Sequence, residues 1–174
     1  AQFCLGLMFY SGEFIQRNMN ISIKYFTFAA DKNHAFAQFY LGSIYLTGEY
    51  VPQNINKSIC YLTKAANQNI SKAQLLLGDI YFNDNNIEKS IHYYKLAAQN
   101  NDPVAQAHLG IIYISEKYFP LDINKSIHYF KLASNQNYSY AQFALGKIFS
   151  TPKYHLIDLK KAFYYYELAS NNNN

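Results

Sequence analysis

The sequence predicts an all-α protein, an α-solenoid of five stacked helix–turn–helix units. Two recurring phrases carry that prediction. The phrase AQFYLG at residues 37–42 returns, with small changes, at 1–6, 73–78, 105–110 and 141–146. A second phrase follows each copy, as in NKSICYL from residue 56 and NKSIHYF from residue 124. Self-similarity at a period of roughly 20 to 50 residues is typical of repeat proteins, whose units stack because none can bury its apolar face alone.

The units tile the chain, and we treat 1–174 as a single repeat domain. Because the chain starts with Ala inside a repeat, we expect it to be a fragment of a longer array. We interpret the glycine that ends each first phrase as a packing position, at which two helices can approach closely. These glycines are Gly6, Gly42, Gly78, Gly110 and Gly146. The predicted units are 1–36, 37–72, 73–104, 105–140 and 141–174.

Each unit begins with one helix and ends with a second. In the first helix of unit 37–72, Ala37, Leu41 and Ile44 recur at helical spacing. Asn or Asp precedes each second helix, where its side chain can cap free backbone N–H groups: Asn18, Asn54, Asn86, Asp122 and Asp158. Asn follows each second helix, where a left-handed backbone is needed: Asn33, Asn69, Asn101, Asn137 and Asn173. A tyrosine occupies one fixed position of every second helix: Tyr25, Tyr61, Tyr93, Tyr129 and Tyr165.

The pattern A-x-x-x-L-G-x-x-Y, then G-x-x-V-x-x-N-x-x-K-S, then Y-x-x-x-A-A resembles the Sel1-like repeat, a relative of the tetratricopeptide repeat. Residues 37–69 match it best, with Gly42, Gly48 and Asn54 in register. The resemblance implies a right-handed superhelix and a non-catalytic scaffold or adaptor that binds other proteins. The sequence departs from the pattern in using Asn rather than Gly after the second helices. Glu116 and Pro152 also replace the loop glycine in the last two units.

By similarity to tetratricopeptide arrays, the first helices line a concave groove. Their outward positions vary between units while the packing positions do not, so we predict that they bind a partner. Most are aromatic or aliphatic, which suits an apolar helix or extended peptide of another protein. The alternative is that some only pack against the adjacent unit. The predicted partner-binding residues are Phe36, Phe39, Tyr40, Ser43, Lys72, Leu75, Asp79, Phe82, Val104, Ala107, His108, Ile111, Tyr140, Phe143 and Lys147.

Composition disfavours several other classes of function. The formal charge is +4, with lysines spread along the chain, so we expect no nucleic-acid binding. A repeat protein that reads single RNA bases would need polar and basic groove positions, and the predicted groove is apolar. No apolar run is long enough for a transmembrane helix, and no signal peptide is visible. We therefore expect Cys4 and Cys60 to be free thiols in the cytoplasm. Five Asn-x-Ser strings keep a lumenal location as the alternative.

Catalytic and metal motifs are weak, so we expect no enzyme activity, no cofactor, no metal and no small-molecule substrate. The Ser-x-x-Lys string at 150–153 falls in a predicted loop and lacks the other elements of an acylation site. His92 and His128 share one repeat position, and Cys60 holds the equivalent position in unit 37–72, which is too few ligands for zinc. A different role for the whole array stays open: it could be the regulatory or docking arm of a larger enzyme, such as a kinase or a ubiquitin ligase.

Overall fold

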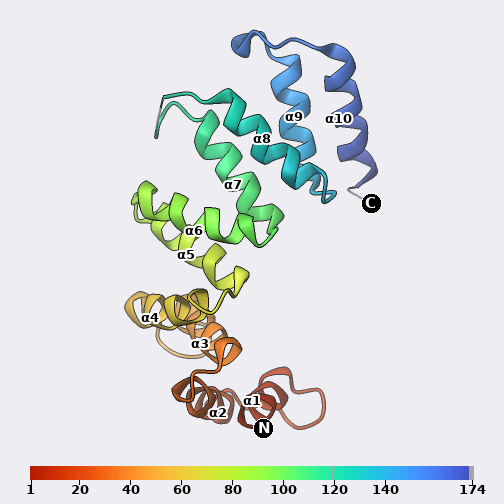
Figure 1. Cartoon of the computed structure of the whole chain (residues 1–174). Coiled ribbons are helices and arrows are strands. Elements are labelled where there is room, and N and C mark those ends of the chain that lie inside the picture. The colour runs from red at the N-terminus through yellow and green to blue at the C-terminus, as the bar shows by residue number, and fades with distance from the viewer. Residues whose placement is uncertain (119, 173–174) are drawn as a thin grey trace. The chain divides into compact units, whose positions relative to one another are not determined.

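The structure is a computed structural model that describes residues 1–118 and 120–172, and within those ranges it is helical and contains no strand. Its helices follow one another as antiparallel pairs, seen most clearly for α9 and α10 in Figure 1. The first helices of the pairs are α1 (Gln2–Ser11), α3 (Ala35–Thr47), α5 (Ser71–Asn83), α7 (Pro103–Ile114) and α9 (Ser139–Ser150). The second helices are α2 (Met19–Asp31), α4 (Ile55–Ala66), α6 (Ile87–Gln99), α8 (Ile123–Ser134) and α10 (Leu159–Asn171). A short 3₁₀ helix, η1 (Pro152–Tyr154), lies in the last loop.

Two compact units, residues 1–77 and 78–174, make up the chain. In the first, α1 packs on α2, α3 packs on α4, and the two hairpins meet through α2 and α3. In the second, α7 pairs with α8 and α9 with α10, while α6 contacts α7 and α8 contacts α9. Hairpins that stack through the second helix of one and the first helix of the next define an α-solenoid, so the predicted fold class is confirmed.

The predicted helix boundaries agree with the backbone geometry. The side chains of Asn18, Asn54, Asn86, Asp122 and Asp158 each accept a hydrogen bond from the backbone N–H three residues later, at 2.9 to 3.3 Å. At the other end, Asn33, Asn69, Asn101 and Asn137 have φ of 61°, 61°, 59° and 60°, the left-handed conformation that ends a helix. Asn173 lies outside the described residues. Local sequence alone therefore determines where most second helices begin and end.

The fixed tyrosine of each second helix forms a ring stack within its own hairpin. Tyr61 stacks on Tyr45, for example, with ring centroids 6.0 Å apart and planes 3° apart. The other stacked pairs are Tyr25 with Phe9, Tyr93 with Tyr81, Tyr129 with Tyr113 and Tyr165 with Phe149. In four hairpins a lysine ammonium lies over the first-helix ring, as Lys57 does 5.2 Å from the Tyr45 centroid. The tyrosine position is thus a packing position.

The recurrent glycines make room for a large side chain of the second helix, and at Gly42 an added Cβ atom would also lie 3.2 Å from the backbone nitrogen of Leu62. A Cβ atom added to Gly78 would lie 2.4 Å from Cδ1 of Tyr94, and one added to Gly110 would lie 2.8 Å from Cδ1 of Phe130. At Gly42 the nearest atom belongs to Leu62, at 2.6 Å. Because these neighbours are buried rings or branched side chains, they cannot easily move aside.

The glutamine of the AQxxLG phrase links successive hairpins, a role that the sequence pattern did not predict. Gln106 is 2% exposed, its amide donates to the Ala98 carbonyl at the end of α6, and it accepts from Gln136 after α8. Gln38 makes the equivalent bonds with the Ala30 carbonyl and Gln68. Buried polar groups are costly unless paired, so these bonds help to hold the hairpins in register.

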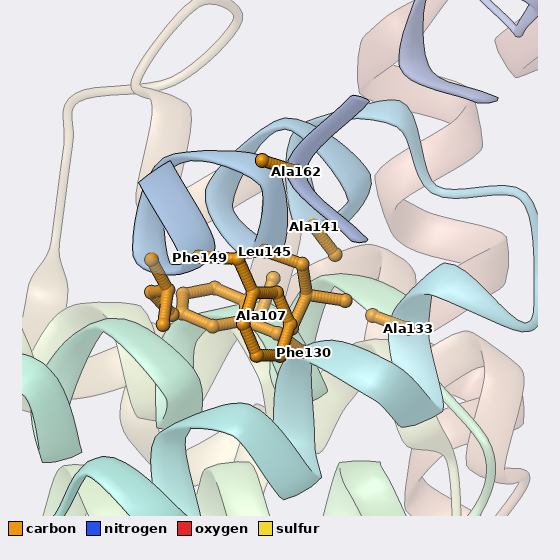
Figure 2. Packing of buried hydrophobic residues seen from close by; sticks show 8 residues of the cluster. Ala107, Phe130, Ala133, Ala141, Leu145, Phe149 and Ala162 are labelled. Atoms are coloured by element: carbon orange, nitrogen blue, oxygen red, sulfur yellow. The ribbon is translucent and has the colours of Figure 1, made fainter. Parts of the chain in front are cut away.

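Each unit has an apolar core between its hairpins. In residues 1–77 it centres on Phe26, Leu41 and Ile44. In residues 78–174 it centres on Phe130, Leu145 and Phe149, which Figure 2 shows gathered together with small alanines around them. Small side chains beside large ones are what a close-packed interface between helices requires.

Candidate functional site

In residues 1–77, the predicted binding positions divide into exposed and packed side chains. Phe36 is 53% exposed and Lys72 is also exposed, whereas Phe39, Ser43 and Leu75 are half-buried. Ser43 turns its hydroxyl onto its own helix and donates to the Phe39 carbonyl at 3.1 Å. These side chains come from α3 and the start of α5, as the helical spacing predicted.

Tyr40 belongs to an aromatic cluster that joins α3 to the hairpin before it. Its ring stacks on Phe26 at 5.1 Å and also contacts Tyr10 at 5.4 Å and Phe3 at 5.8 Å, measured between centroids. With three rings of the preceding hairpin around it, Tyr40 packs against the adjacent repeat. At this residue the packing alternative describes the observed contacts.

In residues 78–174, the predicted positions lie on α5, α7 and α9. Tyr140, Phe143 and Lys147 of α9 are exposed. The half-buried ones are Asp79, Phe82, Val104, His108 and Ile111. Phe82 contacts the Tyr118 ring edge-on at 5.4 Å, so it is tied to the loop after α7.

Ala107 departs from the prediction that it faces outward. It is 3% exposed and belongs to the core cluster that contains Phe130. The methyl group is too short to reach the surface, although its helical position is correct. The sequence pattern located the position, but it could not show how far a small side chain lies below its neighbours.

A pocket of about 270 Å³ lies above Ala107. Val104, His108 and Ile111 of α7 form one side, and Tyr138 and Tyr140 at the start of α9 form the other. The structure therefore brings together five of the predicted binding residues around one hollow. Tyr138 was missed because it precedes its helix and falls outside the helical pattern. A second hollow, lined in part by Tyr140, Phe143 and Tyr166, lies between α9 and α10.

His108 connects this pocket to a small polar cluster. Its ring stacks on Tyr94 of α6, with centroids 4.9 Å and planes 6° apart. The Tyr94 hydroxyl donates to Oδ1 of Asp79 at 2.7 Å, and Nε2 of His108 lies 3.7 Å from the same oxygen. Burial of Tyr94, with the hydrogen bond to Asp79, raises the pKa of its hydroxyl, so the hydroxyl stays a donor. Tyr94 directly follows the fixed Tyr93 of its helix, and the repeat pattern did not predict that the residue at this position covers the glycine.

The remaining chemistry-bearing side chains do not converge. His92 and His128 each contact the tyrosine that follows them in sequence, and Cys4 and Cys60 are exposed free thiols. Within residues 1–118 and 120–172 there is no group of three or more His, Cys, Asp and Glu side chains arranged to hold a metal ion. Across the part of the chain that the structure describes, no helix is both long enough and apolar enough to span a membrane.

Comparisons with known proteins identify the repeat. A family model described as "Sel1 repeat" matches residues 1–34, 35–70, 71–102, 103–138 and 139–174. The last four matches start where α3, α5, α7 and α9 start, two residues before our predicted units (35 against 37, for example). A search of curated proteins finds no significant match.

Solved structures share the fold over nearly the whole chain. A Sel1 repeat protein from Oxalobacter formigenes is 29% identical over 99% of this chain and 72% of its own, with a TM-score of 0.87. The protein c5321, a protective antigen of uropathogenic Escherichia coli strains with an SLR fold, is 26% identical with a TM-score of 0.89. This chain covers only 38% of that protein. MamA, at 18% identity, a TM-score of 0.64 and coverage of 97% and 94%, shows likeness of fold alone.

Proposed function

The chain belongs to the Sel1 repeat family, and from that premise we propose that it is a non-catalytic adaptor that binds a peptide or helix of another protein. Sel1 repeat proteins are generally scaffolds for protein–protein interaction. In each compact unit the proposed surface is the outward side of the first helices, which we call the first-helix face. It comprises outward positions of α3 and the start of α5 in residues 1–77, and of the rest of α5, α7 and α9 in residues 78–174.

The observation that carries the proposal is the exposure of large aromatic side chains on this face. Phe36, Tyr140 and Phe143 are 53%, 48% and 52% exposed. Aromatic side chains bury a large area at low entropic cost and are common at the centres of interfaces. The face also varies between repeats where packing does not require one residue, as a recognition surface does.

A selection experiment tests the proposal. The purified full chain is used to enrich binders from a displayed library of random linear peptides. The triple variant Phe36→Ala, Tyr140→Ala, Phe143→Ala should lose about tenfold or more in affinity for the enriched peptides. A matched triple variant on the second helices, Phe28→Ala, Phe163→Ala, Tyr164→Ala, removes aromatics that are also exposed and should bind as the wild type does.

Circular dichroism must first show that both triple variants are as helical as the wild type. If the second-helix variant loses binding and the first-helix variant keeps it, recognition lies on the other side of the hairpins and the proposed surface is wrong. If no peptide is enriched above an unrelated helical protein, the chain does not bind linear peptides.

A further inference from the structure

The pocket over Ala107 exists because one repeat lacks a large side chain that other repeats have. The third letter of the AQxxLG phrase is Phe3, Phe39, Leu75, Ala107 and Phe143 in turn. Phe3 and Phe143 contact the ring that covers their own glycine, Phe26 and Tyr166, at 5.8 and 5.7 Å. In the fourth repeat the corresponding ring is Phe130, and Ala107 leaves the space beside the helix open.

The size and lining of this pocket suit one side chain rather than a small molecule. Its volume of about 270 Å³ lies below the roughly 300 Å³ at which small-molecule sites usually begin. Val104 and Ile111 supply apolar walls, and Tyr138 and Tyr140 supply aromatic ones. Because the His108 ring is held flat against Tyr94, it forms a fixed wall for an aromatic ring.

The polar group next to the pocket carries an incompletely balanced negative charge. Among the residues that the structure describes, the only ion-pair partner of Asp79 is His108, 3.7 Å away. No lysine or arginine within those ranges pairs with it. The Tyr94 hydroxyl holds Oδ1 in place, and the Asp79 side chain is 38% exposed. A cation from outside can therefore reach this carboxylate without first displacing one from the protein.

We infer that the pocket binds an aromatic side chain of a partner peptide, with a neighbouring lysine or arginine of that peptide paired to Asp79. This inference rests on the proposed function and specifies the partner for one part of the first-helix face. The aromatic ring occupies the space that Phe3 fills in the first repeat, where Phe3 stacks on His34 and contacts Phe36, at the positions equivalent to Tyr138 and Tyr140. The lysine or arginine of the peptide supplies a positive charge that balances the Asp79 carboxylate.

The aromatic part is tested with Ala107→Phe and the peptides enriched on the wild type. Because phenylalanine occupies this position in three other repeats, the variant should fold and fill its own pocket. We expect peptides with an aromatic residue to dominate the wild-type pool and to bind the variant about thirtyfold more weakly. Phe163→Ala, which removes an exposed ring that does not line the pocket, should leave affinity unchanged within about twofold.

The charge part is tested with Asp79→Asn, which keeps a carbonyl oxygen to accept the Tyr94 hydrogen bond. We expect a loss of about tenfold with the best enriched peptide. Replacing the lysine or arginine of that peptide by glutamine should cost about the same with the wild type, and nothing further with Asp79→Asn. The loss should shrink as salt is added, because a half-exposed ion pair is screened.

The outcomes separate this inference from the proposed function. If Ala107→Phe and Asp79→Asn bind like the wild type while the first-helix triple variant does not, the pocket inference is wrong and the proposed function stands. Enrichment of acidic or wholly polar peptides would also overturn the inference. If Ala107→Phe unfolds, then Val104→Trp, which fills the pocket from its α7 wall, decides the aromatic part. If no peptide is enriched, both proposals are wrong.

Discussion

One pair of repeat positions forms a ring stack in each compact unit, but the surroundings of the stack differ. The pair is Tyr40 and Phe26 in residues 1–77, and His108 and Tyr94 in residues 78–174. In residues 1–77, Tyr40 stacks on Phe26 and is enclosed by further rings from α1. In residues 78–174, the equivalent His108 stacks on Tyr94 with nearly the same ring separation. Nε2 of His108 lies 3.7 Å from the Asp79 carboxylate, and His108 also lines the pocket. The shared backbone fixes the stack, and the surrounding side chains decide whether the stacked ring is enclosed, as at Tyr40, or lines a pocket, as at His108.

The largest expected effect is a difference in stability between these two positions. Tyr40→Ala should lower the free energy of unfolding by about 2 to 4 kcal/mol, because it removes a ring packed among three others. His108→Ala should cost about 1 kcal/mol or less, because this side chain is 35% exposed and has one ring stack. Urea unfolding of each variant measures both values. Equal losses would mean that His108 is a packing residue and would remove the contrast between the units.

The next largest effect concerns Tyr94, the ring that stacks on His108 and covers Gly78 in residues 78–174. Gly78→Ala should destabilise the chain by about 1 to 3 kcal/mol, because the new methyl group would overlap the buried Tyr94 ring. At a helix position with open space the same change would stabilise by about 0.5 to 1 kcal/mol, so the sign of the change is informative. A double-mutant cycle with Tyr94→Ala, followed by urea unfolding, should show strong coupling. A more stable Gly78→Ala variant would refute the close contact.

Packing positions that are alike in both units should respond alike. Gln106→Ala leaves the Ala98 carbonyl without its side-chain donor and should cost about 1 to 2 kcal/mol. Gln38→Ala breaks the equivalent bond to the Ala30 carbonyl and should cost the same within error. Gln136→Ala, which removes only the exposed partner of Gln106, should cost clearly less. Thermal unfolding followed by circular dichroism ranks the three variants, and a large difference between Gln106 and Gln38 would contradict their equivalence.

The smallest expected effect is a difference between helices in how their caps make the stability of the chain depend on pH. Asp122 and Asp158 cap α8 and α10 and pair with Lys125 and Lys161 at 2.7 and 2.8 Å, whereas neutral asparagines cap α2 and α4. The hydrogen bond from each lysine lowers the pKa of its carboxyl group in the folded chain. A carboxyl group whose pKa is lower in the folded chain stabilises the fold at pH values above its pKa in the unfolded chain. This stabilisation is lost as the pH falls through its pKa in the folded chain.

The double variant Asp122→Asn, Asp158→Asn should therefore be less stable than the wild type near neutral pH. The gap should close as pH falls from about 5 to about 2. Urea unfolding at several pH values measures the gap, and the variant Asn18→Ala serves as a control whose effect on stability should not change with pH. A gap that is constant across this range would show that the carboxyl groups act as uncharged caps.

The sequence by itself determined the repeat, the all-α fold and most helix ends. These features depend on interactions between residues close in sequence, such as Asn54 capping the N–H of Lys57 or Asn69 taking a left-handed backbone. Helical period also predicted which positions of the first helices point outward, although Tyr40 is enclosed by other rings and Ala107 is buried. The offset of two residues between our predicted units and the family-model matches does not affect any of these conclusions.

Only the tertiary structure decided which outward positions are free to bind. Tyr40 is enclosed by rings from another hairpin, and Ala107 lies at the floor of a pocket. The contact of Tyr94 with Asp79 and His108 joins α6 to α5 and α7, and it depends on side chains that the repeats do not share. Side-chain size acts across helices, so one small residue at Ala107 leaves a pocket whose walls come from two hairpins.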